Sequence, residues 1–277
     1  MALDRPISTR DKIKEVAQQM IAEHGVDGIS IRDIITAAGQ RNMASLYYYF
    51  RSKEELIKEL IVDASILMEG NRADHLAKLE EIGEPLSVRQ IAHVLISGAK
   101  LDPLQGGRNS TIMRFLAAVT QTHRHLFNEA IGDKYNKTFQ RCLDLLREQL
   151  KHIPLPILNQ RLLFFSICAT NLLTAREEGL ASGGHAREYW SQPGTYLNIL
   201  DFMCGGLEAP VTQAEAMGTM SDHAPSIRHF TLPDPYPHET APQPDKEKKK
   251  RRSRKKTAAA DGAEQPARAR EKQTSAS

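Results

Sequence analysis

The stretch from Ser30 to Lys53 constrains the fold most tightly, because it reads as two short helices joined by a glycine turn and followed by a third. The Ser30 hydroxyl can cap the first helix, and apolar residues then recur at helical spacing at Ile31, Ile34, Ile35 and Ala38. Gly39 follows where that helix must end, since glycine readily adopts the positive φ of a helix terminus. Leu46 and Phe50, four residues apart, give the second helix an inward face. This pattern is typical of a helix-turn-helix, whose second helix enters the major groove of DNA.

The segment from Thr9 to about Leu60 resembles the TetR family of transcriptional regulators. Its most specific part is LYYYFRSKEEL, residues 46–56, which is close to the family's L-Y-x-[HY]-F-x-[SN]-K-x-x-L. An αα-hairpin would show the same hydrophobic spacing, but the tyrosine run followed at once by Ser-Lys-Glu-Glu is specific. Within it, Ser52 and Glu55 are spaced as a capping box that opens the third helix. One departure is that the stretch 40–47 is one residue longer than the family commonly has, which would rotate residues 41–43 relative to the groove.

This resemblance implies a set of DNA-contacting residues. By their place in the motif, Tyr47, Tyr49 and Lys53 would hold phosphates. The candidates for base contacts are Arg41, Asn42, Met43, Ser45 and Tyr48, and Arg32 in the preceding helix completes the set. Phosphate contacts position a protein on DNA, whereas base-edge contacts specify the sequence.

Composition supports an all-α fold and places the charge unevenly. Aromatic residues make up only 6% of the 277 residues, and no alternating strand pattern appears. From Pro210 onward, 13 Lys and Arg stand against 9 Asp and Glu, a net of +4. The first 209 residues hold 24 against 25, a net of −1. We therefore expect DNA affinity in the folded part to depend on where its charges lie.

Breaks in the pattern divide the chain into three regions. We predict a helix-turn-helix DNA-binding domain over 8–54, a larger helical ligand-sensing and dimerisation domain over 55–208, and a disordered basic tail over 209–277. The second region begins with a long helix from Lys53 toward Leu79 or Ile82, which Pro85 ends. Ser87 and Gln90 form another capping box. Further helices are expected at 87–101, 108–122, 124–151, 156–180 and 193–207.

The last two of these helices carry the most apolar faces. Such faces can fill the protomer core or pair with a second copy, and the family resemblance implies a homodimer. Five polar residues stand in otherwise apolar helices and are candidates for lining a small-molecule cavity: Arg114, Gln121, Asn171, Thr174 and Arg176. Exposure, or hydrogen bonding within the core, is the alternative for each of them. The ligand itself is not specified by these residues.

The region after Glu208 changes in composition. Eight of the fourteen prolines fall between Pro210 and Pro266, and the segment 246–256, KEKKKRRSRKK, holds nine basic residues in eleven. Such a segment cannot bury enough apolar surface to offset its ordering entropy. It can bind the DNA backbone without sequence preference by releasing counterions, or it can act only as a solubilising tail.

Several function classes have no support in the sequence. Phosphate-loop, dinucleotide and metalloprotease motifs are missing, and Cys142, Cys168 and Cys204 stand far apart in apolar settings that suggest buried reduced thiols. The longest apolar run, Leu162 to Leu173, is too short and too polar to span a bilayer. We predict a cytoplasmic protein that is not an enzyme and has no cofactor or metal. The resemblance implies a TetR-like regulator, a repressor that a small molecule releases from a double-stranded DNA operator. The alternative is a protein of the same fold that coats DNA or recruits a partner without an inducer.

Overall fold

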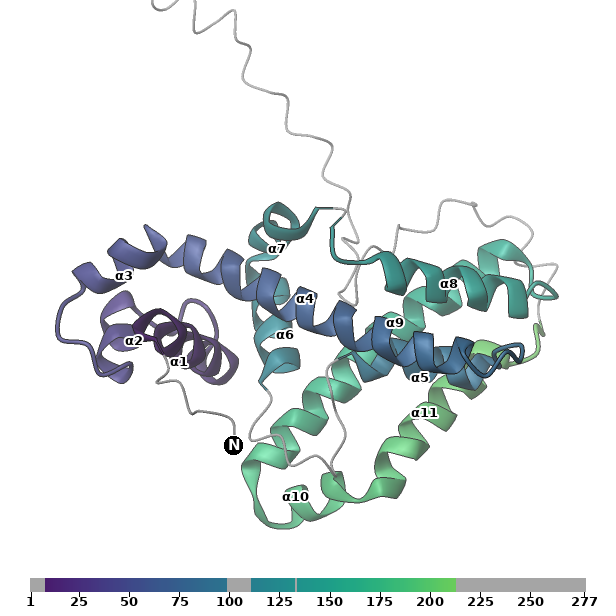
Figure 1. Ribbon diagram of the computed structural model, residues 1–277. Coiled ribbons are helices and arrows are strands. Elements are labelled where there is room, and N and C mark those ends of the chain that lie inside the picture. The colour runs from purple at the N-terminus through teal and green to yellow at the C-terminus, as the bar shows by residue number, and fades with distance from the viewer. Residues whose placement is uncertain (1–7, 99–110, 133, 213–277) are drawn as a thin grey trace, which may run out of the picture. The chain divides into compact units, whose positions relative to one another are not determined.

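The computed structural model describes residues 8–98, 111–132 and 134–212, and over these residues the fold is all-helical (Figure 1). Most of the predicted basic tail, from residue 213 onward, lies outside the described residues. In the described part eleven helices follow one another: α1 Thr9–His24, α2 Ile31–Ala37, α3 Ala44–Phe50, α4 Lys53–Glu80, α5 Val88–Ser97, α6 Ile112–Thr122, α7 Arg124–Ile131, α8 Lys137–Gln149, α9 Leu155–Ser182, α10 Gly184–Ser191 and α11 Pro193–Glu208.

The three N-terminal helices form the head of the protein. Each predicted serine cap is present: the Ser30 hydroxyl accepts from the Asp33 amide, and the Asp33 carboxylate accepts from the Ser30 amide in return. Ser52 likewise accepts from the amide of Glu55, but the Glu55 carboxylate pairs with Lys58 at 2.5 Å. The expected box at α4 is therefore a single cap. The apolar faces of the three helices are buried together through Ile13, Ala17, Ile21, Ile34, Ile35, Leu46 and Phe50.

The long helix α4 leads from the head into the C-terminal domain, where it packs against α5, α7 and α8 (Figure 1). The capping box of Ser87 and Gln90 is confirmed at the start of α5. The expectation of one helix over 124–151 was wrong. The chain breaks into α7 and α8, with left-handed backbone at Gly132 (φ 54°) and Tyr135 (φ 57°), and two such residues cannot continue a right-handed helix. The short helix α10 had also not been expected.

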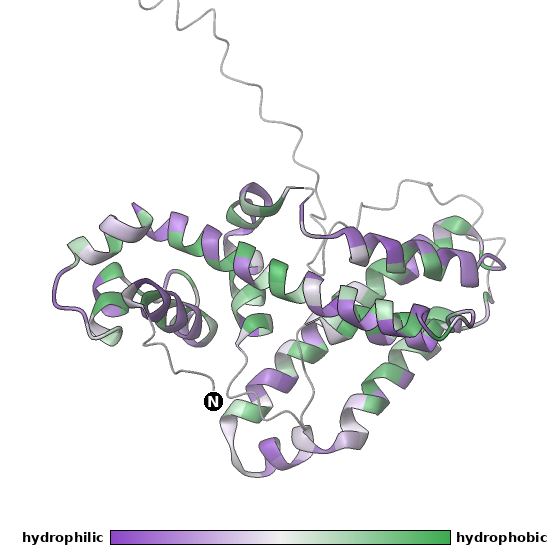
Figure 2. Cartoon of the chain, viewed as in Figure 1, coloured by the Kyte–Doolittle hydropathy of each residue, from purple (hydrophilic) through white to green (hydrophobic). Residues whose placement is uncertain are grey.

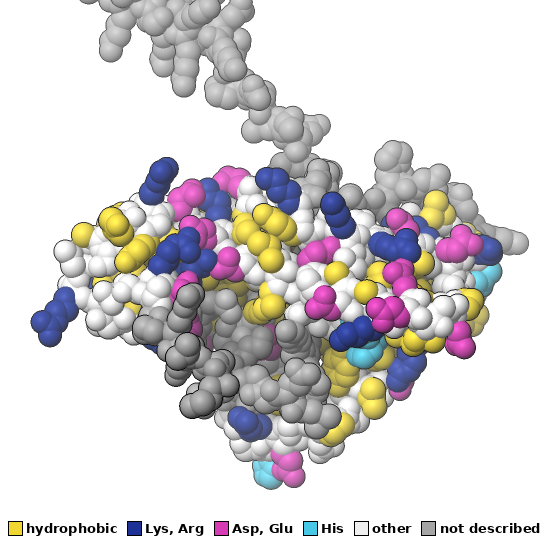
Figure 3. All heavy atoms as spheres, viewed as in Figure 1, with side chains coloured by type: hydrophobic (Ala, Val, Ile, Leu, Met, Phe, Trp, Pro, Cys, Tyr) yellow, Lys and Arg dark blue, Asp and Glu magenta, His cyan; other side chains and the backbone are white. Residues whose placement is uncertain are grey.

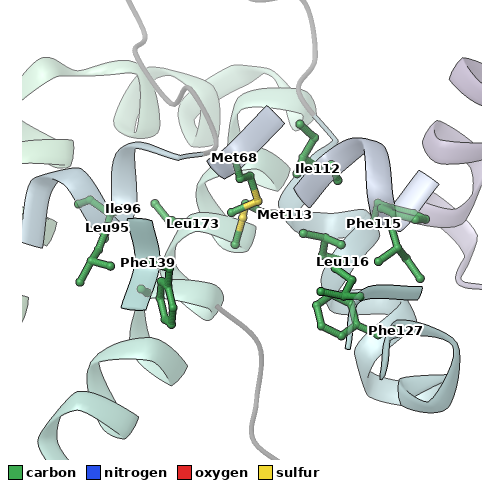
Figure 4. Close-up of a cluster of buried hydrophobic side chains, with 14 of the residues drawn as sticks. Met68, Leu95, Ile96, Ile112, Met113, Phe115, Leu116, Phe127, Phe139 and Leu173 are labelled. Atoms are coloured by element: carbon green, nitrogen blue, oxygen red, sulfur yellow. The ribbon is translucent and has the colours of Figure 1, made fainter. Parts of the chain in front are cut away.

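The core continues from the head through the C-terminal domain. Each helix carries both polar and apolar residues (Figure 2), and the apolar ones form a single buried cluster. Figure 4 shows part of it, with Met68 of α4 and Met113 of α6 at the centre and the aromatic rings of Phe115, Phe127 and Phe139 around them. Because this cluster includes α1, α4 and α6, the head and the C-terminal domain share one apolar core.

Candidate nucleic-acid interface

The turn between α2 and α3 is stabilised by its own polar groups. Gly39 has a φ of 72°, the left-handed value that glycine tolerates without strain. The Asn42 Oδ1 atom accepts from the amide of Ala44 at 2.8 Å, and the amide of Ser45 donates to the Asn42 carbonyl at 3.0 Å. Asn42 thus supports the first turn of α3. Its side-chain oxygen is already used within the protein.

Helix α3 divides its residues between the core and the surface. Leu46 and Phe50 are buried, whereas Tyr48 is 82% exposed. Tyr47 is half-exposed, and the ring of Tyr49 lies partly buried against that of Tyr48, with centroids 4.9 Å apart. Ser45 is also partly buried, and the remaining predicted contacts of this head are exposed: Arg32, Arg41, Asn42 and Met43. The structure therefore presents most of the predicted DNA-binding residues on the surface of α2, the turn and α3.

Lys53 takes a position that its place in the motif did not indicate. Its ammonium donates to the carbonyl of Val26 at 2.6 Å and to that of Ile29 at 2.5 Å. Both carbonyls belong to the loop between α1 and α2. Lys53, the first residue of α4, therefore ties the start of α4 to this loop within the head. The predicted phosphate contact would have to use the remaining ammonium donor.

Arg51 gave no signal in the sequence. It is exposed at the end of α3 and has a φ of 64°, a conformation that non-glycine residues seldom adopt. This turn connects α3 to α4, and the Arg51 guanidinium adds a positive charge next to the residues of α3. Arginine has no preference for a positive φ, so the residue type alone did not reveal this turn.

Ion pairs join α1 to α4 beside the head. Arg10 pairs with Glu59, and Lys14 pairs with both Glu59 and Asp63. Lys and Arg side chains are interspersed with Asp and Glu on the face shown in Figure 3. The basic side chains of this region are thus interspersed with acidic ones, so the net positive charge of this surface is small.

The five polar ligand candidates are distributed over two environments. Gln121 and Asn171 are exposed, and Asn171 donates to the carbonyl of Ile167 within α9. The others lie where α6 meets α9. Thr174 donates to the Met113 carbonyl at 3.4 Å, Arg176 is buried with its guanidinium 5.8 Å from the ring centroid of Tyr196, and Arg114 is partly buried.

A hollow of about 490 Å³ opens between α9 and α11. Its lining is almost wholly apolar: Phe164, Phe165, Cys168, Phe202, Met203 and Leu207, with Gly205, Gly206 and Arg161. Phe202 is 67% exposed and Leu197, five residues earlier on α11, is 49% exposed, whereas Leu200 is only 2% exposed. Exposed large apolar side chains around a hollow are typical of an interaction surface or a ligand-binding groove.

Comparison with known proteins identifies the head. Residues 13–60 match the family model described as bacterial regulatory proteins, tetR family. The head is a TetR-family domain. The matched range contains α2, α3 and all the predicted DNA contacts, from Arg32 to Lys53.

Relatives of the TetR-type head are transcriptional repressors. The chain is 37% identical over 59 residues to the HTH-type transcriptional repressor KstR2 of Mycolicibacterium smegmatis, covering 21% of this chain and 28% of that protein. It is 33% identical over 57 residues to the HTH-type transcriptional repressor AcnR of Corynebacterium efficiens, covering 21% and 30%. The chain thus spans less than a third of the length of these curated relatives.

Solved structures of TetR-family regulators resemble the chain more loosely. A protein from Shewanella sp. PV-4 has a TM-score of 0.47 at 16% identity, covering 72% of this chain and 97% of its own. The regulator PfmR of Thermus thermophilus has a TM-score of 0.37 at 17% identity, covering 74% and 92%. The family assignment therefore rests on the N-terminal match. In the described ranges, no helix is long and apolar enough to cross a membrane.

Proposed function

We propose that the chain is a transcriptional regulator that binds double-stranded DNA and represses by occupying an operator. The observation that carries this is the TetR-family match over residues 13–60, on a head whose α3 exposes Tyr47 and Tyr48. A helix in the major groove needs side chains that reach outward while its other face stays packed. Helix α3 meets both conditions, since Leu46 and Phe50 hold it to the core.

The proposed contacts divide by exposure. Tyr48, the most exposed tyrosine of α3, and Met43 and Arg41 from the turn are proposed to reach base edges. Tyr47 is proposed to hold a phosphate, and the partly buried Tyr49 supports the ring of Tyr48. An arginine that meets guanine bidentately discriminates against the wrong base by about 1–3 kcal/mol.

The proposed assembly is a homodimer through α9 and α11. The apolar hollow between these helices, with the exposed Phe164 and Phe202 in its lining, suits a second copy of the same surface. Two-fold pairing would set two heads on neighbouring half-sites one helical turn apart. Leu200 is buried inside the protomer, so a charge there would disturb folding and say nothing of the partner.

A substitution pair tests the dimer. Phe202→Glu should yield monomers in light scattering, because a carboxylate would enter the apolar contact. Ile82→Glu is the matched control, since Ile82 is 64% exposed in the turn that follows α4 and lies outside the hollow. A folded Phe202→Glu variant that stays dimeric would place the interface elsewhere.

The release mechanism proposed is a shift in head spacing. A small molecule bound in the C-terminal domain would favour an arrangement of protomers whose heads no longer match the operator. The small molecule can shift the equilibrium between the two arrangements only to the extent that it binds one of them more tightly than the other. The alternative is a protein of the same fold that needs no inducer. It is favoured by the fact that the five polar candidates do not line one cavity, since Gln121 and Asn171 are exposed. Ligand-dependent loss of operator binding would decide between the two.

The function itself is tested on DNA. Selection of bound duplexes from a random pool by the full-length chain should return a two-fold symmetric sequence. Tyr48→Ala should then lose preference for that sequence, whereas Tyr189→Ala should not, because Tyr189 is an exposed tyrosine on α10, away from the head. Failure to enrich any duplex would overturn the proposed function.

A further inference from the structure

Glu177 is a buried acid of α9 whose carboxylate reaches the first turn of α6. The residue is only 3% exposed. Its Oε1 atom accepts from the amide of Met113 at 3.0 Å, and its Oε2 atom accepts from the amide of Arg114 at 2.9 Å. First-turn amides have no intrahelical acceptor, and the positive end of the helix dipole favours a negative charge. The carboxylate of another helix thus serves as the cap of α6, whose own N-cap, Thr111, makes no side-chain cap bond.

The same turn of α6 contacts the head. The Gln18 Nε2 atom of α1 donates to the Thr111 Oγ1 atom at 2.9 Å. Helix α6 packs along α1 more extensively than α4 does, although α4 is the helix directly joined to the head. Thr174 of α9 adds a second link by donating to the Met113 carbonyl. Residues 111–114 therefore form hydrogen bonds with both α9 and α1.

We propose that Glu177 is a positioning residue for DNA binding, which fixes the head relative to α9 through the first turn of α6 and the Gln18–Thr111 bond. The inference rests on the proposed function, since α9 lines the surface proposed to pair two protomers. In such a dimer, the separation of the heads depends on how each α1 is held with respect to its own α9. Operator half-sites have a fixed spacing, so a loosened turn costs specific binding without changing any residue that touches DNA.

The test compares two adjacent glutamates in the full-length chain. Glu177→Gln keeps the shape but offers one carbonyl oxygen to two amides, and leaves the other amide facing an NH₂ group. Glu178→Gln is the matched control, because Glu178 is exposed on the same helix. Affinity is measured for a duplex selected by the wild-type chain and for a random duplex. Glu177→Gln should weaken the selected duplex about tenfold and leave the random duplex unchanged, whereas Glu178→Gln should change neither.

Gln18→Ala provides a second route and a coupling measurement. This substitution removes the Gln18–Thr111 hydrogen bond. Because Gln18 is partly exposed, the variant should fold even if Glu177→Gln does not. It should show the same loss of affinity for the selected duplex and none for the random duplex. In the Gln18→Ala background, Glu177→Gln should add little, because the hydrogen bond through which Glu177 is proposed to act on the head is already absent. Additive losses, or equal losses on both duplexes, would overturn the inference.

Hydrogen exchange separates this inference from the proposed function. If the wild-type chain selects no duplex, the proposed function fails, but the coupling within the fold is still measurable. Glu177→Gln should then speed amide exchange in residues 112–116 and also in α1 around Gln18. Faster exchange confined to α6 would refute positioning of the head by Glu177.

Discussion

Gly179 is a site at which one added methyl group should disturb the packing of two helices. It lies inside α9, and a Cβ atom built there would stand 1.9 Å from Cδ1 and 2.4 Å from Nε1 of Trp190. These separations are far inside van der Waals contact, so Gly179→Ala must push the indole of α10 off the surface of α9.

The magnitude follows from two opposing effects. Alanine is preferred to glycine in a helix interior by about 1 kcal/mol. Trp190 is partly buried against the core, and an indole buries about 200 Å² in a typical site. Exposing roughly half of it costs about 2.5 kcal/mol at ~25 cal/mol per Å². We therefore expect Gly179→Ala to lower the free energy of unfolding by about 1–2 kcal/mol.

Gly70→Ala is the matched control. Gly70 lies inside α4, and its added Cβ would have no neighbour within 4 Å, so this variant should gain about 0.5–1 kcal/mol. Urea unfolding followed by far-UV circular dichroism measures both variants. Trp190 is the single tryptophan of the chain, so its emission should shift to longer wavelength in Gly179→Ala only. Equal stabilisation of the two variants with unchanged emission would refute the close packing of α9 and α10.

Three further outcomes are expected. Lys53→Met should lower the free energy of unfolding by about 1.5–3 kcal/mol, because two carbonyls lose a charged donor; a variant as stable as the wild type but weaker on every duplex would instead support the phosphate role. Burial lowers the pKa values of His75 and His93 below 6.5, and their rings meet edge to face with centroids 4.7 Å apart. As the pH falls, these histidines bind protons in the unfolded chain before they do so in the folded chain. Their contribution to the free energy of unfolding should therefore be complete above pH 6.5 and fall as the pH drops toward the folded-state pKa values. If the free energy of unfolding depends equally steeply on pH in a His75→Gln, His93→Gln double variant, this expectation is wrong. Burial raises the pKa of Cys142 to about 12, so thiol reagents should modify the partly exposed Cys168 well before Cys142, which mass spectrometry of the labelled chain would check.

Local signals allowed most of the head to be predicted from the sequence. The caps at Ser30 and Ser87 were predictable because each depends on residues three apart in the chain. The burial of Leu46 and Phe50 and the exposure of Tyr48 follow from helical periodicity in the same way. The TetR motif supplied the rest, since it names residue types at fixed positions.

What escaped prediction depends on contacts between distant segments. Lys53 bonds to a loop more than twenty residues earlier, and Glu177 caps a helix that begins 65 residues before it. Neither pairing leaves a spacing rule in the sequence. The different environments of Leu197 and Leu200 likewise depend on which side of α11 meets the protomer. The break between α7 and α8 had one visible sign, Gly132, but the left-handed backbone of Tyr135 had none.

The pairing of α1 with α4 has a consequence for ionic strength. Residues 8–54 hold seven Lys and Arg and six Asp and Glu, a net charge of +1. Arg10 and Lys14 face Glu59 and Asp63, Lys12 pairs with Glu15, and Lys53 faces carbonyls. The exposed cations that remain in the described head are the arginines at 32, 41 and 51. Arg41 is proposed to reach a base edge, so Arg32 and Arg51 remain for phosphates. Two phosphate contacts per head correspond to a slope of roughly −2 in log affinity against log salt, so the head should hold its operator across salt concentrations that would strip a strongly basic protein from DNA.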